Sequence, residues 1–155
     1  KPAEEVPTRS DEAKVAYEKN LAVLRASLTA FENEQIDEWA NSLADNAVWN
    51  PPSYGAPAGT KEDWKSSLTY YAAEWDSIRL RNATFLPGID SVTHAPDGSV
   101  RYYGTWVGVH KSGMKTSIHY YATLEFNSDN KVTSASEYMD IGGLLNAVAP
   151  KSGKK

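Results

Sequence analysis

The sequence predicts an α+β domain in which three N-terminal helices lie on one face of a curved antiparallel or mixed sheet. Apolar residues recur every three or four positions over roughly the first 75 residues, and then alternate with a period of two over most of the remainder. Turn residues separate the later segments at short intervals, which is typical of a meander of neighbouring strands. Neither an internal repeat nor a domain boundary is visible, so we expect one domain.

The first two helices follow each other closely. The first covers about residues 11–32, with Ser10 as its expected N-cap and an apolar face that runs along its whole length. Asn33 ends this helix, and the same spacing continues over residues 36–47, which predicts a second helix. Residues 48–50 then have an extended pattern.

A proline-rich loop leads to the third helix. The loop, residues 50–59, cannot be helical because proline fixes φ and disfavours the helical conformation in the residue before it. Thr60 and Asp63 resemble a capping box. The helix that they open places these residues on one face: Trp64, Leu68, Tyr71 and Trp75.

The second half of the chain predicts five strands and a short closing helix. The strands are expected over residues 78–86, 89–94, 100–110, 116–126 and 131–140, and the helix over residues 144–148. The last two strands have one polar face, with His119 in the middle of one strand and Asp140 at the end of the next. The face consists of Ser117, His119, Tyr121, Thr123, Glu125, Val132, Ser134, Ser136, Tyr138 and Asp140.

Composition excludes several classes of function. The chain has no cysteine, which excludes disulfides, thiolate metal sites and a cysteine nucleophile. Its formal net charge is −4 and the folded region has no dense basic run, so we expect no nucleic-acid partner. No apolar run approaches the roughly 18–20 residues that a membrane span needs.

Both ends of the chain are expected to be flexible. Residues 1–11 are polar, contain Pro2 and Pro7 and have no initiator methionine, which predicts a linker that remains after a preceding segment is removed. Residues 149–155 form a basic tail. These ends are compatible with an exported or periplasmic protein, but a cytoplasmic location stays equally open.

Two stretches resemble a known superfamily. The run Ala44-Asp-Asn-Ala-Val-Trp-Asn-Pro-Pro52 resembles the A-D-D-A-x-x-x-x-P stretch of nuclear-transport-factor-2-like proteins, and it follows a helical pair as expected. The ending Lys131-Val-Thr-Ser-Ala-Ser-Glu-Tyr-Met-Asp140 is similar to the last strand of SnoaL-like polyketide cyclases. The resemblance covers residues 12–148 and implies a cystatin-like, cone-shaped α+β barrel. Such a fold has three helices in the concave face of a strongly bent sheet, a pocket at its wide end and frequent homodimerisation through the sheet.

His119 and Asp140 are the candidate catalytic pair. Imidazole titrates near neutral pH, and partial burial raises the pKa of a carboxyl group towards values useful for proton transfer. SnoaL-like cyclases resemble this arrangement, with an aspartate base near the end of the last strand and a histidine on the preceding one. The structural alternative is a hydrogen-bonded histidine and an aspartate that caps the turn at Gly142.

Further residues are candidates for the wall of a ligand pocket. Asn50 occupies the position near which ketosteroid isomerase keeps its base, and an amide cannot take a proton. Tyr17 lies near the position of an oxyanion-stabilising tyrosine in that enzyme. An aromatic wall for a flat apolar ligand would consist of Trp49, Tyr71, Trp75, Trp106 and Tyr121, although each has the spacing of an ordinary core residue.

No metal or cofactor is expected. His94, His110 and His119 have no spacing typical of metal ligands, and phosphate-binding or nucleophile-elbow motifs are missing. We therefore predict a pocket for a small apolar, aromatic or polycyclic molecule, with cofactor-free proton transfer by Asp140 and His119 if the chain is an enzyme. The reaction would be an isomerisation, cyclisation, dehydration or hydrolysis. The alternative is a non-catalytic ligand-binding or dimerisation module of the same fold.

Overall fold

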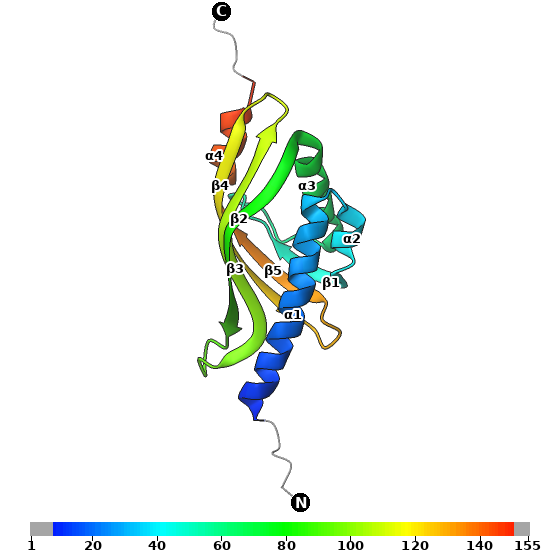
Figure 1. Ribbon diagram of the computed structural model, residues 1–155, viewed down its shortest axis with the longest axis vertical. Helices are drawn as coiled ribbons and strands as arrows, with labels where there is room; N and C mark the ends of the chain where they lie inside the picture. The colour runs from blue at the N-terminus through cyan, green and yellow to red at the C-terminus, as the bar shows by residue number, and fades with distance from the viewer. Residues whose placement is uncertain (1–7, 151–155) are drawn as a thin grey trace, which may run out of the picture.

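A single mixed sheet curves around the helices in the computed structural model, which describes residues 8–150 (Figure 1). The strand order is β1-β5-β4-β3-β2. In chain order the elements are α1 (Arg9–Glu32), α2 (Ile36–Ala40), β1 (Leu43–Asn50), α3 (Lys61–Glu74), β2 (Trp75–Ile89), β3 (Pro96–His110), β4 (Lys115–Phe126), β5 (Val132–Tyr138) and α4 (Ile141–Val148).

The predicted fold class is confirmed. Strands β2 to β5 pair antiparallel in sequence order, and β1 pairs parallel with β5, so the sheet is mixed. Helix α1 crosses the concave face of the sheet, with α2 and α3 beside it (Figure 1). The sheet stays open, because β1 and β2 are its two edges and do not pair with each other.

Helix α1 begins earlier than the sequence predicts. Thr8, and not Ser10, is the N-cap, and it forms a capping box with Asp11. Residues 9–11 of the predicted linker therefore belong to the helix, whereas residues 1–7 lie outside the described part of the chain. The predicted basic tail also falls mostly outside it, since residues 151–155 are not described. Within residues 8–150, no helix combines the length and the apolar character that crossing a membrane requires.

The second predicted helix is wrong over most of its length. Helix α2 ends at Ala40, and Leu43–Asn50 is strand β1. Leu43, Ala47 and Trp49 are spaced for either element, but Asp45 and Asn46 would interrupt a buried helical face. Pairing with β5 satisfies the backbone of β1, so tertiary contacts override the helical spacing.

The predicted strand over residues 89–94 is also wrong. Strand β2 continues through Pro87 and Gly88 to Ile89, and residues 91–93 form a turn. The Asp90 carboxylate organises this turn by accepting hydrogen bonds from the backbone N–H groups of Val92 and Thr93 at 3.0 and 2.7 Å. The hydrogen bonds of the Asp90 side chain therefore favour a turn over the strand that the short apolar alternation predicts.

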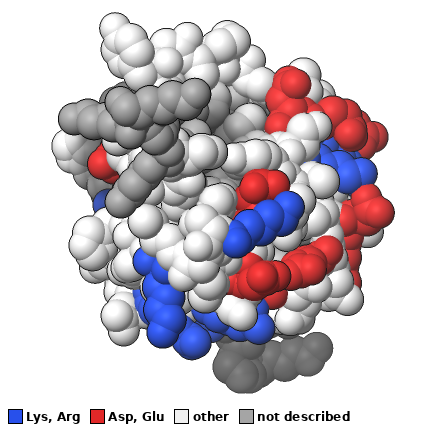
Figure 2. Space-filling view, turned by 90° about the horizontal axis from the view of Figure 1, so that it is seen from above, with Lys and Arg blue, Asp and Glu red and all other residues white. Residues whose placement is uncertain are grey.

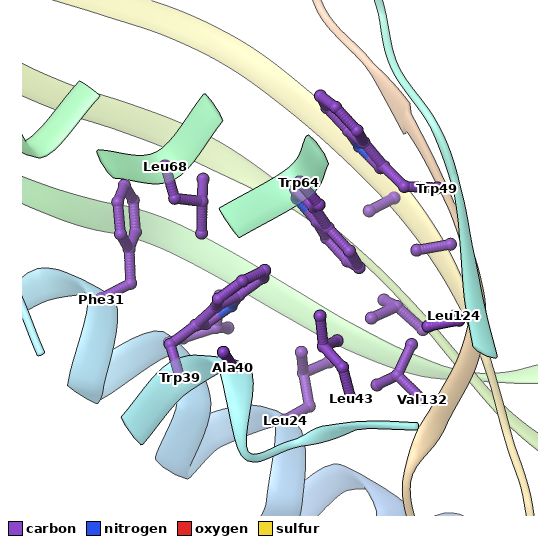
Figure 3. Close-up of a cluster of buried hydrophobic side chains, with 14 of the residues drawn as sticks. Leu24, Phe31, Trp39, Ala40, Leu43, Trp49, Trp64, Leu68, Leu124 and Val132 are labelled. Carbon is purple, nitrogen blue, oxygen red and sulfur yellow. The ribbon is translucent and has the colours of Figure 1, made fainter. Parts of the chain in front are cut away.

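The core lies between the helices and the concave face of the sheet. Figure 3 shows the indole of Trp64, from α3, between those of Trp39 from α2 and Trp49 from β1. Trp64 stacks on Trp49, with ring centroids 6.0 Å apart, and meets Trp39 edge-on at 5.0 Å. Three elements that are separated in sequence therefore meet on one aromatic side chain.

Candidate functional site

A cavity of about 110 Å³ lies between the helices and the concave face of the sheet. Its wall is mainly apolar. Aromatic side chains from helices α1, α2 and α3 and from strands β2, β3 and β4 supply much of it: Phe31, Trp39, Trp64, Tyr71, Trp75, Tyr102, Trp106 and Tyr120. Among residues 8–150, no lysine, arginine or histidine lines this wall, and Glu137 is the one carboxyl group that does.

The alternation of β4 decides which face of the sheet lines the cavity. Ile118, Tyr120, Ala122 and Leu124 point into the cavity, so His119 and Tyr121 point to the opposite, outer face. The cavity therefore uses the apolar face of the last two strands. The polar face, from which the sequence predicts the catalytic pair, is turned away from the helices.

Glu137 lies on β5 directly opposite Ala122 of β4, with its side chain on the cavity side of the sheet. Only 9% of the residue is exposed. Its Oε1 accepts a hydrogen bond from the hydroxyl of Tyr120 at 2.6 Å, and its Oε2 accepts one from Nε1 of Trp49 at 2.6 Å. Each carboxylate oxygen has two lone pairs, so both oxygens retain room for another partner.

Burial raises the pKa of Glu137 above its ordinary value, because the aromatic wall removes water from the charged form. The hydrogen bonds from Tyr120 and Trp49 lower this pKa but do not cancel the effect of burial. The pKa of Tyr71 rises to about 12 through burial and the nearby Glu137 charge. Burial also raises the pKa values of Tyr102 and Tyr120, so all three tyrosines are neutral proton donors at ordinary pH.

Trp64 carries a second unusual polar group. Its Nε1 is buried and has no acceptor at full hydrogen-bond geometry among residues 8–150. This N–H is directed at the Glu137 carboxylate, where its hydrogen bond lowers the pKa of the carboxyl group together with those of Tyr120 and Trp49, although its geometry does not satisfy the donor fully.

His119 and Asp140 do not lie together in the cavity. His119 is exposed on the outer face, where its Nδ1 contacts the Thr105 hydroxyl at 3.3 Å. Asp140 is exposed beyond the end of β5 and caps α4 by accepting a hydrogen bond from the backbone N–H of Gly143 at 2.9 Å. The expectation that both groups face one pocket is therefore wrong, because alternation along β4 puts His119 on the outer face and β5 ends before Asp140, which caps α4 instead.

Three of the predicted wall residues line the cavity, namely Tyr71, Trp75 and Trp106. Trp49 stands behind the wall and reaches the site through its bond to Glu137.

The other three predicted wall residues lie elsewhere. Tyr17 packs against the core from α1 without lining the cavity. Asn50 is exposed and donates to the Ser136 hydroxyl at 3.1 Å. Tyr121 lies on the outer face, beside Tyr138.

Sequence reasoning missed Glu137, although its position contained a signal. The alternation that puts Ser134, Ser136 and Tyr138 on the polar face assigns Ala135 and Glu137 to the apolar one. A lone carboxylate on an apolar strand face is uncommon and points to a paired or functional group. As for metals, residues 8–150 contain no cluster of three or more histidine, aspartate or glutamate side chains that could hold an ion.

Solved structures share this fold at low sequence identity. A putative polyketide cyclase from Xanthomonas campestris superposes with a TM-score of 0.69 at 14% identity, covering 86% of this chain and 99% of that one. An NTF2-like protein of unknown function from Burkholderia pseudomallei gives 0.68 at 14% identity, with 85% and 98% covered. A protein with a ketosteroid isomerase-like fold from Catenulispora acidiphila, in complex with trimethylamine, gives 0.64 at 13% identity, with 80% and 89% covered.

Sequence comparison adds no assignment, because no family model and no curated protein matches the chain. The structural neighbours therefore establish the NTF2-like, ketosteroid isomerase-like fold, which agrees with the resemblance drawn from the sequence.

Proposed function

We propose that this chain, which has the fold of NTF2-like and ketosteroid isomerase-like proteins, binds a small apolar ring compound in its aromatic cavity and exchanges a proton with it through Glu137. The neighbours described as a putative polyketide cyclase and as a trimethylamine complex support a small-molecule pocket. The observation that carries the proposal is the buried Glu137 carboxyl group, which is the one carboxyl group that the described part of the chain contributes to the cavity wall.

The surroundings of Glu137 suit proton transfer. A carboxyl group in an apolar cavity, without a cation to neutralise it, has a raised pKa and is a stronger base than one in water. The hydroxyl of Tyr120 holds one carboxylate oxygen in place, which fixes the direction of the remaining lone pairs. Buried carboxyl groups with shifted pKa values in clefts are typical of acid–base sites.

The volume of the cavity favours a ligand with one small ring. An apolar cavity of about 150 Å³ holds benzene. The cavity here, at about 110 Å³, is of the same order, so we propose a single small ring in place of the polycyclic ligand that the sequence suggests. Cyclopentanone, a five-membered ring with one oxygen, is therefore a suitable probe.

The proposed step is simple proton exchange. The Glu137 carboxylate takes a proton from the carbon next to the carbonyl, which leaves a neutral carboxylic acid and an enolate. The acid then returns a proton to the same carbon and regenerates the ketone. In deuterium oxide the carboxyl group exchanges with solvent between turnovers, so deuterium accumulates in the ketone. The step requires no cofactor.

Proton NMR of cyclopentanone in deuterium oxide tests the proposal. The protein is expected to accelerate loss of the signal from the protons beside the carbonyl, and Glu137→Gln to reduce this acceleration at least a hundredfold, as for loss of a general base. The controls are His119→Ala and Asp140→Asn, which alter groups outside the cavity and are expected to keep the wild-type rate. Equal rates for wild type and Glu137→Gln, or loss of exchange in the controls, would contradict the proposal.

The outer face of the sheet supports a second proposal, a homodimer. A row of three tyrosines crosses this face, because Tyr121 of β4 lies opposite Tyr103 of β3 on one side and Tyr138 of β5 on the other. Tyr103 is 47% exposed and Tyr138 is 59% exposed. Figure 2 shows the acidic side chains gathered mostly on the side where Figure 1 places α2 and α3. This row of tyrosines has few charges between its members, and two copies of it can pack against each other across a two-fold axis. We therefore propose that a second copy of this chain binds to the outer face of the sheet.

A further inference from the structure

We propose that Ser112 is a nucleophile, activated by His110, that takes an acyl group from small activated esters such as aryl esters and thioesters. The site lies in the turn between β3 and β4, and none of its residues lines the cavity. The inference therefore goes beyond the proposed function and depends on different residues. The sequence alone does not reveal the site, because its third member, Glu74, belongs to the end of α3.

Three side chains contact one another in series at this turn. The hydroxyl of Ser112 lies 2.9 Å from Nδ1 of His110, and Nε2 of the same ring lies 3.8 Å from Oε2 of Glu74. A hydroxyl, an imidazole and a carboxylate in this order are a nucleophile, its base and the group that orients the base. Ser112 is exposed, so an ester from solvent can reach its hydroxyl.

The backbone fixes the tautomer of His110. The backbone N–H of Ser112 donates to Nδ1 of His110 at 3.1 Å. Because a backbone N–H can only donate, Nδ1 carries no proton, and the proton of the neutral ring is on Nε2, towards Glu74. The Ser112 hydroxyl therefore donates to Nδ1, which is the direction in which a general base takes the proton of a nucleophile.

The imidazole and its carboxylate are held in place by their neighbours. Only 12% of the His110 side chain is exposed, and Trp75 meets its ring edge-on, with centroids 4.7 Å apart. Lys111 contacts Glu74 twice: its ammonium group lies 3.1 Å from Oε1, and its backbone N–H donates to the Glu74 carbonyl at 2.9 Å. Since lysine occupies Oε1, Oε2 is left for the histidine. The base is thus oriented before an ester arrives.

The proposed step balances without a cofactor. Oγ of Ser112 attacks the carbonyl carbon of the ester while its proton passes to Nδ1 of His110, and the imidazolium faces the Glu74 carboxylate. The bond from the carbonyl carbon to the leaving group then breaks, the aryl oxide or thiolate departs as an anion, and His110 releases the proton to water. Protonation of Nδ1 also frees the backbone N–H of Ser112, which can then donate to the negative oxygen of the intermediate.

Acetylation of the wild-type protein by p-nitrophenyl acetate tests the proposal. Peptide mass spectrometry measures the rate at each serine. Ser112 is expected to react about a hundredfold faster than Ser128, which is exposed in the turn between β4 and β5 and is the matched control without a histidine partner in residues 8–150. Hydroxylamine then removes acetyl groups from serine but not from lysine. Equal rates at the two serines, or a label confined to Lys111, would overturn the proposal.

A pair of histidine variants tests the role of the base. His110→Gln keeps a polar side chain in the turn but removes the base, and it is expected to lower the acetylation rate of Ser112 to that of Ser128. His119→Gln is the matched control, because His119 also contacts a hydroxyl, that of Thr105 at 3.3 Å, but lies on the outer face of the sheet. It is expected to leave the rate at Ser112 unchanged. An unchanged rate in His110→Gln would overturn the proposal.

Nitrogen NMR of the imidazole supplies a readout that does not depend on the folding of a variant. Neutral His110 in the wild-type protein is expected to carry its proton on Nε2. Glu74→Gln is expected to keep this tautomer and to lower the acetylation rate about tenfold, because the imidazolium then faces a neutral amide. A proton on Nδ1 of the neutral ring, or an unchanged rate in Glu74→Gln, would overturn the proposed arrangement.

Discussion

At the scale of single residues, Glu137 links the chemistry of the cavity to the stability of the fold. The folded protein holds the Glu137 proton more tightly than the unfolded chain does, because burial raises the pKa from an ordinary value of 4.5. The stabilising contribution of the protonated group is fully present below the unfolded pKa and is lost as pH rises through the folded pKa. Above that pKa, the fold carries a buried charge without a cation.

Glu137→Gln is therefore expected to gain stability relative to wild type as pH rises. The difference between the free energies of unfolding of variant and wild type should be smallest below pH 4.5, increase above it, and level off once Glu137 is ionised in both states. Urea unfolding over a pH series measures this difference. Glu125→Gln, at an exposed position of β4, is the control for the loss of one surface charge. If the difference in unfolding free energy stays constant across the pH series, burial does not raise the pKa of Glu137 and the account is contradicted.

At the scale of elements, the N-cap of α3 is Thr60, which lies four residues before Trp64 and fixes the start of the helix. The Thr60 side chain accepts a hydrogen bond from the backbone N–H of Asp63 at 3.2 Å, and the Asp63 carboxylate accepts one from the backbone N–H of Thr60 at 2.7 Å. The first turn of α3 is thereby held, and with it the indole that forms the wall of the cavity. The sequence predicts this capping box correctly.

Thr60→Ala is expected to lower the free energy of unfolding by about 1 kcal/mol, because it leaves a backbone N–H of the first turn without its acceptor. Thr60→Ser keeps the side-chain oxygen and should remain close to wild type. Thermal unfolding of the three proteins measures the effect. Equal losses for alanine and serine would mean that the threonine methyl group, and not the cap, stabilises the helix.

Most elements could be predicted from periodicity and caps, and the misses have physical causes. Residues 43–47 have helical spacing but become strand β1, because β5 offers backbone partners that no local pattern reveals. The candidate site was harder to predict. The sequence separates the two faces of β4 and β5 correctly except at Val132, which it assigns to the polar face and which lines the cavity because the register of β5 shifts beside it. It does not say which face meets the helices. The sequence suggests that the polar face is the functional one, but in the structure this face points away from the helices. Glu137 therefore lies in the cavity, whereas His119 and Asp140 lie outside it.

At the scale of the whole molecule, the two faces of the curved sheet have different surroundings and different proposed roles. The concave face and the helices enclose the cavity, whereas the outer face presents the row of Tyr103, Tyr121 and Tyr138. In the proposed homodimer the two cavities lie on the far sides of the paired sheets. Dimerisation then stabilises the sheet without closing either cavity.

The double variant Tyr103→Ser and Tyr138→Ser is expected to shift the protein from dimer to monomer, because it removes the two most exposed aromatic rings of the row. Sedimentation velocity over a concentration series measures the shift. Tyr54→Ser is the matched control, since Tyr54 is fully exposed in the loop between β1 and α3. A wild-type protein that is monomeric throughout the series would contradict the proposed interface, and the proposed cavity chemistry would be unaffected.

The position of a bound ketone tests the account most directly. A crystal structure of the protein with cyclopentanone is expected to show the ring in the cavity between the helices and the concave face of the sheet, with a carbon beside the carbonyl facing Glu137. A ketone bound on the outer face beside His119, or near Asp140, with the cavity empty would contradict the account.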